Sequence, residues 1–594
     1  MDYLLVGIAG IVCIVAVSVL APRVGVASPL LLVLVGVAVS LLPAVSAIEV
    51  EPEILLAGVL PPLLYSTAVS MPAMDFRRDF TTISGLSILL VIISALVLGL
   101  FFRAVIPGIE LSTGIALGAI VSPTDAVATS IVRKLGVSPR VVTVLEGESL
   151  LNDASALVLL RSAIAATAAS VSLWGVAADF VWAVLAAVVV GLVVGRLNLV
   201  VRARITEAPL STAISFVVPF VAYVPAEHVG ASGLVAAVAA GLVTGQGSPK
   251  YLRPQDRMYE ASNWRTIELL LEGGVFLLMG LELYGVLEDV REAHESTVSA
   301  VLVGVAAGAI ILAIRAAYVL PILISARNRR RKAPQFRERV QDMQDRFDRG
   351  ELRPPGDDAG RLRGRTDEPD GKKRRDEARE RVFRKRIGRA LADVDYITGV
   401  PLGWREGVVL VWAGMRGVVT LAAAQSLPQD TPERSFLILV AFVVAAGTLL
   451  LQGGTLPWVV RALGLANRGD EGETAEAAAL SNELAHAAAD FLETPDLRAS
   501  DGTEYDAETL RGAAERMRRE IDREEEEASE PAPTRAHMVE LRLRTIEAER
   551  KALLRARSLG TYSSAALSDA LRMLDADQIS LELRATTDED DDTR

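Results

Sequence analysis

Acidic and polar side chains interrupt an apolar run at Glu146-Gly147-Glu148-Ser149-Leu150-Leu151-Asn152-Asp153. Residues four apart share one face of a helix, so Glu148 stacks on Asn152. Ser149 stacks on Asp153 on an adjoining strip. A charged side chain at mid-bilayer costs at least about 2.5 kcal/mol, so this face points into a helix bundle or a wet cavity. We interpret it as part of an ion or proton pathway; the alternative is a set of paired polar groups with a structural role.

A second irregularity is Ser122-Pro123-Thr124-Asp125-Ala126, near the middle of another apolar run. Proline lacks a backbone donor and clashes with the carbonyl four residues earlier, here Ala119, so the helix is predicted to break. Interrupted helices at mid-membrane supply carbonyls and half-helix ends to ion sites in transporters. Asp125 adds a charge beside this break. The alternative is a simple kink with a buried aspartate.

A matching irregularity is Trp412-Ala413-Gly414-Met415-Arg416-Gly417, where two glycines bracket an arginine. If the chain contains two inverted repeats, this break and the first one occupy equivalent positions, which predicts a transport site. Arg416 is then placed to offset the negative ends of half-helices. Arg315, in the apolar run 297–325, needs a carboxylate partner, and Glu148 is our candidate.

The chemistry that fits these residue types is cation binding in competition with protons. Hard cations prefer oxygen ligands, and a carboxylate holds either a cation or a proton. Asp125 and Asp153 are the predicted carboxylates, with the hydroxyls of Ser149 and Thr124 as neutral ligands. Asn152 cannot titrate, so the site has one proton carrier fewer than a paired Asp-Asp motif would give.

The whole chain reads as a membrane domain with polar appendages. It has 594 residues, of which 51% are hydrophobic, and one cysteine, which excludes disulfides and cysteine-based metal sites within one chain. A bilayer core of about 30 Å requires roughly 20 apolar residues per crossing. We predict thirteen spans, at 3–21, 29–47, 54–71, 82–106, 111–133, 140–168, 173–198, 208–225, 231–247, 262–284, 297–325, 405–427 and 434–463.

Loop charges predict the orientation, because Lys and Arg concentrate in short cytoplasmic loops. One set of alternate loops carries the basic residues Arg23, Arg77, Arg78, Arg133, Lys134, Arg140, Arg202, Arg204, Lys250, Arg253 and Arg257. The other set carries the acidic residues Glu49, Glu51, Glu53, Glu110, Glu227, Glu288, Asp289, Asp430 and Glu433, with Arg103 and Arg434 as exceptions. We therefore expect the N-terminus outside and the C-terminus in the cytoplasm.

Two polar regions flank the last spans. The predicted membrane domain covers 1–325 and 405–466, with a basic insert at 326–404 and an acidic, largely helical tail at 467–594. Residues 326–400 hold 23 basic and 15 acidic residues, a net charge of +8. The insert is interpreted either as an element that contacts anionic lipid or as a solvated linker. In the tail, 474–493, 506–527 and 537–557 have helical periodicity, Asp588 to Asp592 is expected to be disordered, and no nucleic-acid or catalytic motif is present.

The segments SPTDAVA at 122–128, EGESLLNDASALVL at 146–159 and WAGMRGVVTLAAA at 412–424 resemble the NhaP-type bacterial sodium/proton antiporters and their animal NHE relatives. The resemblance implies an all-α fold of thirteen transmembrane helices in two inverted repeats with discontinuous crossing helices. It also implies a homodimer in the plasma membrane, no cofactor, and electroneutral exchange of one Na+, with Li+ as a further candidate, for one H+. A core domain would move like an elevator against a dimerisation domain.

The same resemblance implies roles for single residues. It assigns ion binding to Asp153, Asp125, Ser149 and Thr124. It assigns support of the core to Glu148, Asn152 and Arg315. One departure is visible, because many relatives have proline directly after the aspartate of the fifth span, whereas here Ala126 follows Asp125 and Pro123 precedes it.

Two other classes of membrane protein share some of these features. An intramembrane aspartyl protease also uses two acids on neighbouring spans, but neither Asp125 nor Asp153 lies in a Gly-x-Gly-Asp segment. A channel is disfavoured because opposed interruptions with titratable acids are typical of alternating access. We therefore predict a transporter rather than an enzyme. Within that class K+/H+ exchange is the rival, since cavity size separates Na+ from K+ and ligand type does not.

Overall fold

The structure is a computed structural model that describes residues 2–42, 51–168, 173–349, 351, 369–466, part of 480–514, and 535–591. The described residues are almost entirely helical, with one isolated β-bridge between Arg498 and Glu504. The chain divides into two compact units. The membrane unit comprises Met1–Ile324 and Leu402–Asn467, and the polar unit comprises Ser325–Pro401 and Arg468–Arg594.

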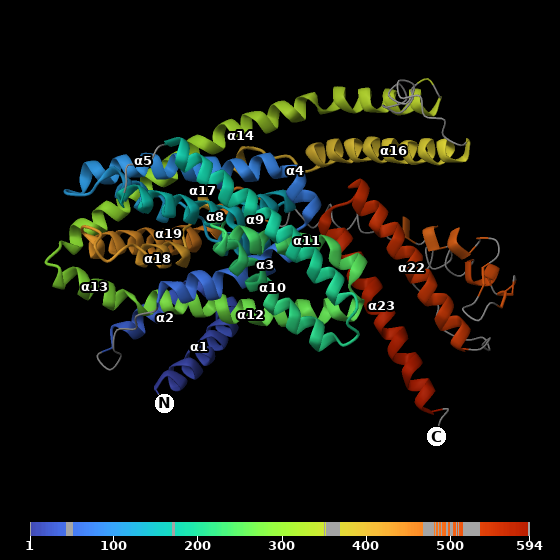
Figure 1. The fold of residues 1–594 in the computed structure, drawn as a ribbon, viewed down its shortest axis with the longest axis horizontal. Helices are drawn as coiled ribbons and strands as arrows, with labels where there is room; N and C mark the ends of the chain where they lie inside the picture. Colours follow the sequence, from blue (N-terminus) through green and yellow to red (C-terminus); the bar gives the residue numbers. More distant parts are fainter. Residues whose placement is uncertain are drawn as a thin grey trace. The chain divides into compact units, whose positions relative to one another are not determined.

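The membrane unit is a succession of apolar helices (Figure 1). Its first part contains α1 (Asp2–Val24), α2 (Ser28–Ser40), η1 (Ile54–Val59), α3 (Leu60–Ser70), α4 (Ala73–Ser84), η2 (Gly85–Leu89), α5 (Leu90–Val105), α6 (Leu111–Ile120), α7 (Val127–Lys134) and α8 (Pro139–Ala168). Its second part contains α9 (Leu173–Arg202), α10 (Ala208–His228), α11 (Gly233–Tyr251), α12 (Pro254–Leu281), α13 (Leu283–Glu292), the start of α14 (Thr297–Asp348), α17 (Trp404–Trp412), α18 (Val418–Gln425) and α19 (Arg434–Ala462). η1 and η2 are short π-helical stretches.

Each predicted apolar run contains a helix or an interrupted pair of helices. Among the described residues, eight helices are long and apolar enough to cross a membrane, and shorter apolar helices cover Ser28–Ser40, Ile54–Ser70 and Leu111–Ile120. The runs at 111–133 and 405–427 are broken into α6 and α7 and into α17 and α18, as the proline and glycine signals predicted. The number of crossings stays a prediction, because neither half of a broken run is long enough alone.

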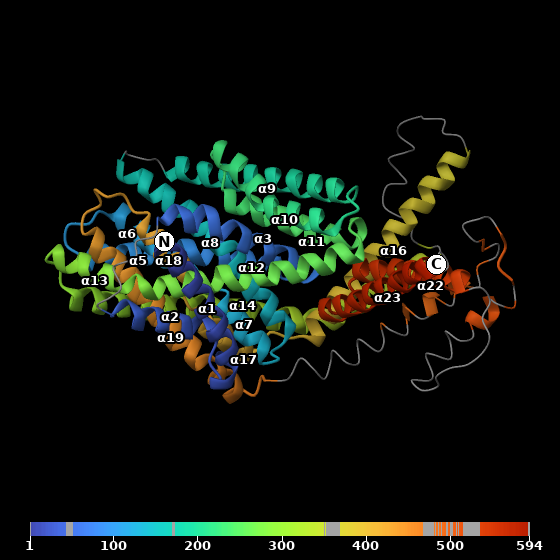
Figure 2. The ribbon, with the colours of Figure 1, turned by 90° about the horizontal axis from the view of Figure 1, so that it is seen from below.

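Helix packing sorts the membrane unit into two groups. We call α1–α3 and α9–α12 the scaffold bundle, in which α11 packs against α3, α9 and α10, and α12 packs against α1 and α2. Figure 2 shows α9, α10 and α11 side by side. We call α4–α8, α14 and α17–α19 the site bundle. Here α6 packs against α5, α8 and α18, and α19 packs against α7, α17 and α18.

The polar unit joins the insert to the tail. The end of α14 pairs with α16 (Pro369–Gly399) through the rings of Phe347 and Phe383, 4.7 Å apart, and the 3.4 Å ion pair of Arg384 with Asp348. α16 packs against α22 (Arg535–Leu559), and α22 packs against α23 (Ser564–Asp591). The two predicted regions of opposite charge are therefore parts of one folded unit.

The tail differs from its prediction in two respects. α22 covers the helical segment predicted at 537–557, but α23 was not anticipated. It continues to Asp591, so the expectation of disorder from Asp588 onward was wrong for the described residues, because the acidic end extends a helix that already packs on α22. The predicted helices at 474–493 and 506–527 lie largely outside the described residues.

Candidate ion-binding site

The first break lies between α6 and α7. α6 ends at Ile120 and α7 begins at Val127, so residues 121–126 carry no helical structure. The carbonyl of Ala119, which Pro123 leaves without its helical donor, accepts from the backbone N–H of Ser122 at 3.3 Å and from its hydroxyl at 3.0 Å. The break is thus present as predicted, and this freed carbonyl is hydrogen-bonded within the chain.

The second break, between Trp412 and Val418, meets the first one. The backbone N–H of Asp125 donates to the carbonyl of Met415 at 2.8 Å. A Cβ atom on Gly417 would lie 1.4 Å from Oδ2 of Asp125, so only glycine allows this carboxylate to approach the second break. Oδ1 of Asp125 accepts from the backbone N–H of Val127, the first residue of α7, at 2.8 Å. The negative charge of Asp125 therefore lies at the positive end of a half-helix.

Arg416 lies at the opposite, carbonyl end of α6. Its side chain is buried, and it donates to the carbonyls of Val121 at 3.0 Å and Ser122 at 3.3 Å, and also to that of Gly414. The last carbonyls of a helix have no partner within it and carry partial negative charge, which a cation offsets. The position of Arg416 is the one expected for a residue that compensates half-helix ends.

Glu148 and Arg315 form the ion pair expected between them. Each side chain is only 1% exposed, and Nη2 of Arg315 lies 2.7 Å from Oε2 of Glu148, with a second contact between Nη1 and Oε1. Nε of Arg315 also donates to the carbonyl of Leu410 at 2.8 Å. A Cβ atom on Gly414 would lie 2.6 Å from Cδ and Nε of Arg315, which explains that glycine. The pair ties α8 to α14 and α17.

Thr124 connects the first break to this pair. Its hydroxyl donates to Oε1 of Glu148 at 3.1 Å and accepts from the side-chain amide of Asn152 at 2.6 Å. The amide of Asn152 also points at the backbone carbonyl of Thr124, 3.5 Å away. Thr124, Glu148 and Asn152 therefore form one buried hydrogen-bonded chain that fixes the break against α8.

A cavity of about 310 Å³ lies beside the crossing breaks. All four predicted ion ligands line it, namely Asp125, Asp153, Ser149 and Thr124. The four predicted supporting residues, Glu148, Asn152, Arg315 and Arg416, are absent from its lining. The structure thus brings the expected ligands together and places the expected supports behind them.

The cavity contains acids that the sequence reasoning missed. Glu268 and Glu272 reach it from α12, and Glu146 reaches it from α8. Glu268 accepts a hydrogen bond from the hydroxyl of Ser66, and Glu146 pairs with Arg133. The spacing of Glu268 and Glu272, four apart in the apolar run 262–284, is the signal that would have found them. With Asp125 and Asp153 they give the cavity a strongly acidic wall.

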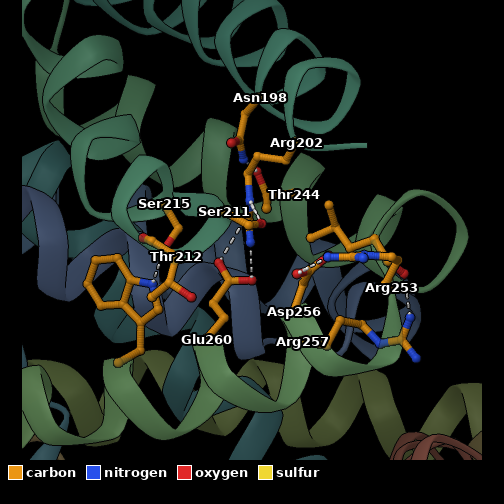
Figure 3. A network of polar contacts seen from close by, with 12 residues as sticks. Asn198, Arg202, Ser211, Thr212, Ser215, Thr244, Arg253, Asp256, Arg257 and Glu260 are labelled. Atoms are coloured by element: carbon orange, nitrogen blue, oxygen red, sulfur yellow. Dashed lines mark hydrogen bonds and ion pairs between the residues drawn. The ribbon is translucent and has the colours of Figure 1, made fainter. Parts of the chain in front are cut away.

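A different polar network lies in the scaffold bundle (Figure 3). Arg202, at the end of α9, is fully buried and forms two hydrogen bonds with Glu260 of α12, at 3.0 and 2.8 Å. Its Nε donates to the hydroxyl of Ser211 on α10 at 3.0 Å. The loop-charge pattern predicts Arg202 in a cytoplasmic loop, whereas the structure buries its side chain where it joins three helices of the scaffold bundle.

The crossing breaks and the acidic cavity together define a class of protein, the secondary ion transporters of the membrane. A family model described as sodium/hydrogen exchanger, transmembrane, matches residues 9–336 and 387–462. The chain therefore belongs to the sodium/hydrogen exchanger family, which confirms the resemblance predicted from the three segments.

Individual relatives agree with this. The chain is 30% identical over 473 residues to an uncharacterised Na+/H+ exchanger of Mycobacterium tuberculosis, covering 77% of this chain and 75% of that one. It is 27% identical over 459 residues to the low-affinity Na+/H+ antiporter NhaS1 of Synechocystis, covering 76% and 72%. The sodium proton antiporter MjNhaP1 of Methanocaldococcus jannaschii, 17% identical, superposes with a TM-score of 0.53 over 77% of this chain and 99% of that chain. The last comparison shows a common fold.

Proposed function

We propose that this protein exchanges one Na+ for one H+ across the membrane by alternating access. The observation that carries the proposal is that Asp125 and Asp153 line one cavity beside two crossing broken helices. Family membership and the Na+/H+ exchange of named relatives support the choice of ions. The family is one of transporters, so we expect no catalysis.

Competition for the same carboxylates would couple the two ions. A carboxylate that ligates Na+ cannot hold a proton, so arrival of one ion releases the other. Ser149 and Thr124 would add neutral oxygens to this site, with the remaining lone pair of the Thr124 hydroxyl still open to a cation. The side chain of Asn152 has no titratable proton, which supports a cycle that moves no net charge.

The walls of the cavity support a sliding mechanism. α3 and α12 of the scaffold bundle contribute one part of the wall, including Thr67 and Glu272. The site bundle contributes the other part, from α7, α8, α18 and the two breaks. Movement of the site bundle along the scaffold would carry Asp125 and Asp153 from one membrane face to the other. In this proposal the buried pair of Glu148 and Arg315 travels with the ion.

The finer assignments of place and assembly are also proposals. We place the protein in the plasma membrane with the N-terminus outside, from the loop charges. The exposed apolar residues Trp182, Leu185 and Val189 on α9 support burial of this helix against lipid or against a second copy in a homodimer. Cross-linking through a cysteine at position 185 in the membrane tests the dimer, and sedimentation with anionic vesicles tests lipid binding by the polar unit.

Proteoliposomes with an internal pH dye test the exchange itself. Adding NaCl outside is expected to drive proton efflux, Li+ to act more weakly, and K+ to act least. Larger efflux with K+ than with Na+ would reassign the cargo. With the membrane potential clamped by potassium and valinomycin, the final Na+ gradient is expected to be the same at every imposed potential. A gradient that follows the potential would contradict one-for-one exchange, since each net charge moved gains about 2.3 kcal/mol per 100 mV.

A further inference from the structure

Two threonines occupy matching places on the two broken spans. Thr129 is the third residue of α7, and Thr420 is the third residue of α18. Each helix begins directly after one of the breaks, so the two threonines correspond to one another in the two halves of the fold. Both side chains are buried, with 4% and 1% of their surface exposed, and both line the acidic cavity.

Neither hydroxyl has a hydrogen-bond partner among the described residues. Buried polar groups are normally paired, and most helical serines and threonines pair with a carbonyl three or four residues earlier. Two neighbours in the same cavity do this. Thr67 donates to the carbonyl of Leu63 at 2.9 Å, and Ser130 donates to that of Val127 at 2.9 Å. The unpaired state of Thr129 and Thr420 is therefore not a general property of this cavity.

The breaks explain why these two hydroxyls stay unpaired. For the third residue of a helix, the carbonyls three and four positions earlier belong to residues that precede the helix, where the chain is not helical. Four residues before Thr129 is Asp125, and four residues before Thr420 is Arg416, both within the breaks. A broken helix thus presents a buried, uncommitted oxygen one turn after each interruption.

We propose that the Thr129 and Thr420 hydroxyl oxygens ligate the transported monovalent cation, one from each broken span. This inference rests on the proposed exchange and extends its ligand set. Each hydroxyl has two lone pairs, so it binds a hard cation without giving up its proton. Asp125, Asp153, Ser149 and Thr124 all come from the first half of the chain. Thr420 would make the bound ion a bridge between both halves.

The test replaces each hydroxyl by a group of the same shape. Thr129→Val and Thr420→Val are expected to raise the Na+ concentration for half-maximal exchange about tenfold each, the loss of one good ion–dipole contact. Thr129→Ser and Thr420→Ser are expected to restore the wild-type value. Thr67→Val and Ser130→Ala are the matched controls, because their hydroxyls line the same cavity but are already bonded.

A second readout is independent of transport. Na+ that binds the folded state is expected to raise the melting temperature of the purified full-length protein, and this rise is expected to need higher Na+ in both valine variants. If a valine variant does not fold, the alanine and serine variants at that position are compared in the same way. Valine variants that match the Thr67→Val control in both readouts would overturn the inference while wild-type exchange stands. Absence of Na+-driven flux in the wild type would instead overturn the proposed function.

Discussion

Among its described residues, the membrane unit contains two buried arginine–glutamate pairs with nearly the same geometry. Arg315 with Glu148 and Arg202 with Glu260 are each joined by two hydrogen bonds, and all four side chains are at most 7% exposed. Their surroundings differ. The first pair contacts both broken spans, the first through Thr124 and the second through Leu410, whereas the second pair joins the helices α9, α10 and α12 through Ser211.

This difference shows that the same chemistry serves two purposes. Breaking either pair leaves an uncompensated buried charge, so both matter for stability. Only the first pair is connected to residues that line the acidic cavity. We infer that the first pair holds the ion site in shape and that the second holds the scaffold together. Stability measurements alone would not separate them, but transport measurements would.

The largest effect is expected at the site itself. Asp153→Asn removes one of the two carboxylates proposed to hold the ion and is expected to abolish exchange without loss of folding, and Asp125→Asn is expected to weaken it strongly. Na+-driven proton flux from purified, folded variants in proteoliposomes is the measurement. Wild-type flux from Asp153→Asn would remove the basis for treating the two pairs differently.

The next effect is expected at the first pair. Glu148→Gln or Arg315→Met is expected to cost roughly 3–5 kcal/mol in the free energy of unfolding, and the double variant is expected to cost less than the sum. A double-mutant cycle of thermal stability measures the coupling. Both single variants are also expected to raise the half-maximal Na+ concentration, because Glu148, which accepts a hydrogen bond from Thr124, loses either its charge or the arginine that holds it in place. Simple additivity would show that the pair contributes nothing as a pair.

The second pair provides the contrast. Glu260→Gln is expected to lower stability by a similar amount, since Arg202 is then buried without its anion. Its half-maximal Na+ concentration is expected to stay within about twofold of the wild type, because Glu260 does not line the cavity. Equal shifts in the half-maximal Na+ concentration for Glu260→Gln and Glu148→Gln would contradict the inference that only the first pair supports the ion site.

Removal of the tail tests whether ion exchange requires the part of the polar unit that follows residue 466. A chain that ends after residue 466 keeps both pairs and every residue of the cavity, so it is expected to retain exchange, with a changed maximal rate or pH dependence. Flux from a correctly inserted truncation at several pH values is the measurement. Complete loss of flux would place part of the ion-transport machinery beyond residue 466.

The smallest effect is expected on the pH dependence of stability, at a contact between two carboxyl groups rather than between an arginine and a carboxyl group. Glu295, in the loop between α13 and α14, lies beside Glu433; burial, together with the hydrogen bond to and repulsion from Glu433, raises the pKa of Glu295 to about 7 from its usual 4.5. The folded protein binds this proton more tightly than the unfolded chain does. The resulting stability is full below pH 4.5 and is lost as the pH rises through about 7.

Glu295→Gln is therefore expected to flatten the dependence of the melting temperature on pH between about 4.5 and 7. The same variant of Glu433 should act in the same direction, since it removes the partner. An unchanged slope in both variants would show that the two carboxyls titrate independently of folding.

Much of the site was predictable because its signals are local. Pro123 and the glycines beside Arg416 predicted the two breaks. Charged residues in apolar runs predicted Asp125, Asp153, Glu148 and Arg315 as members of the candidate site. The contact between Asp125 and Met415 was not predictable, because no pattern in a sequence gives the distance between two breaks. Thr129 and Thr420 escaped notice for a similar reason. A threonine in an apolar run is unremarkable until the loss of its usual carbonyl partner is seen.

The pairing of Arg315 with Glu148 also has a consequence for synthesis of the protein. The two residues lie 167 positions apart, so at ordinary translation speeds roughly 10 to 30 s pass between their emergence from the ribosome. During this interval Glu148 already has one hydrogen-bond donor, the hydroxyl of Thr124, which lies 24 positions earlier in the chain. The nascent first half can therefore bond its buried acid to a hydroxyl first. The full counter-charge of Arg315 is added only when the eleventh predicted span enters the bilayer, and the hydroxyl of Thr124 stays bonded to Glu148 beside it.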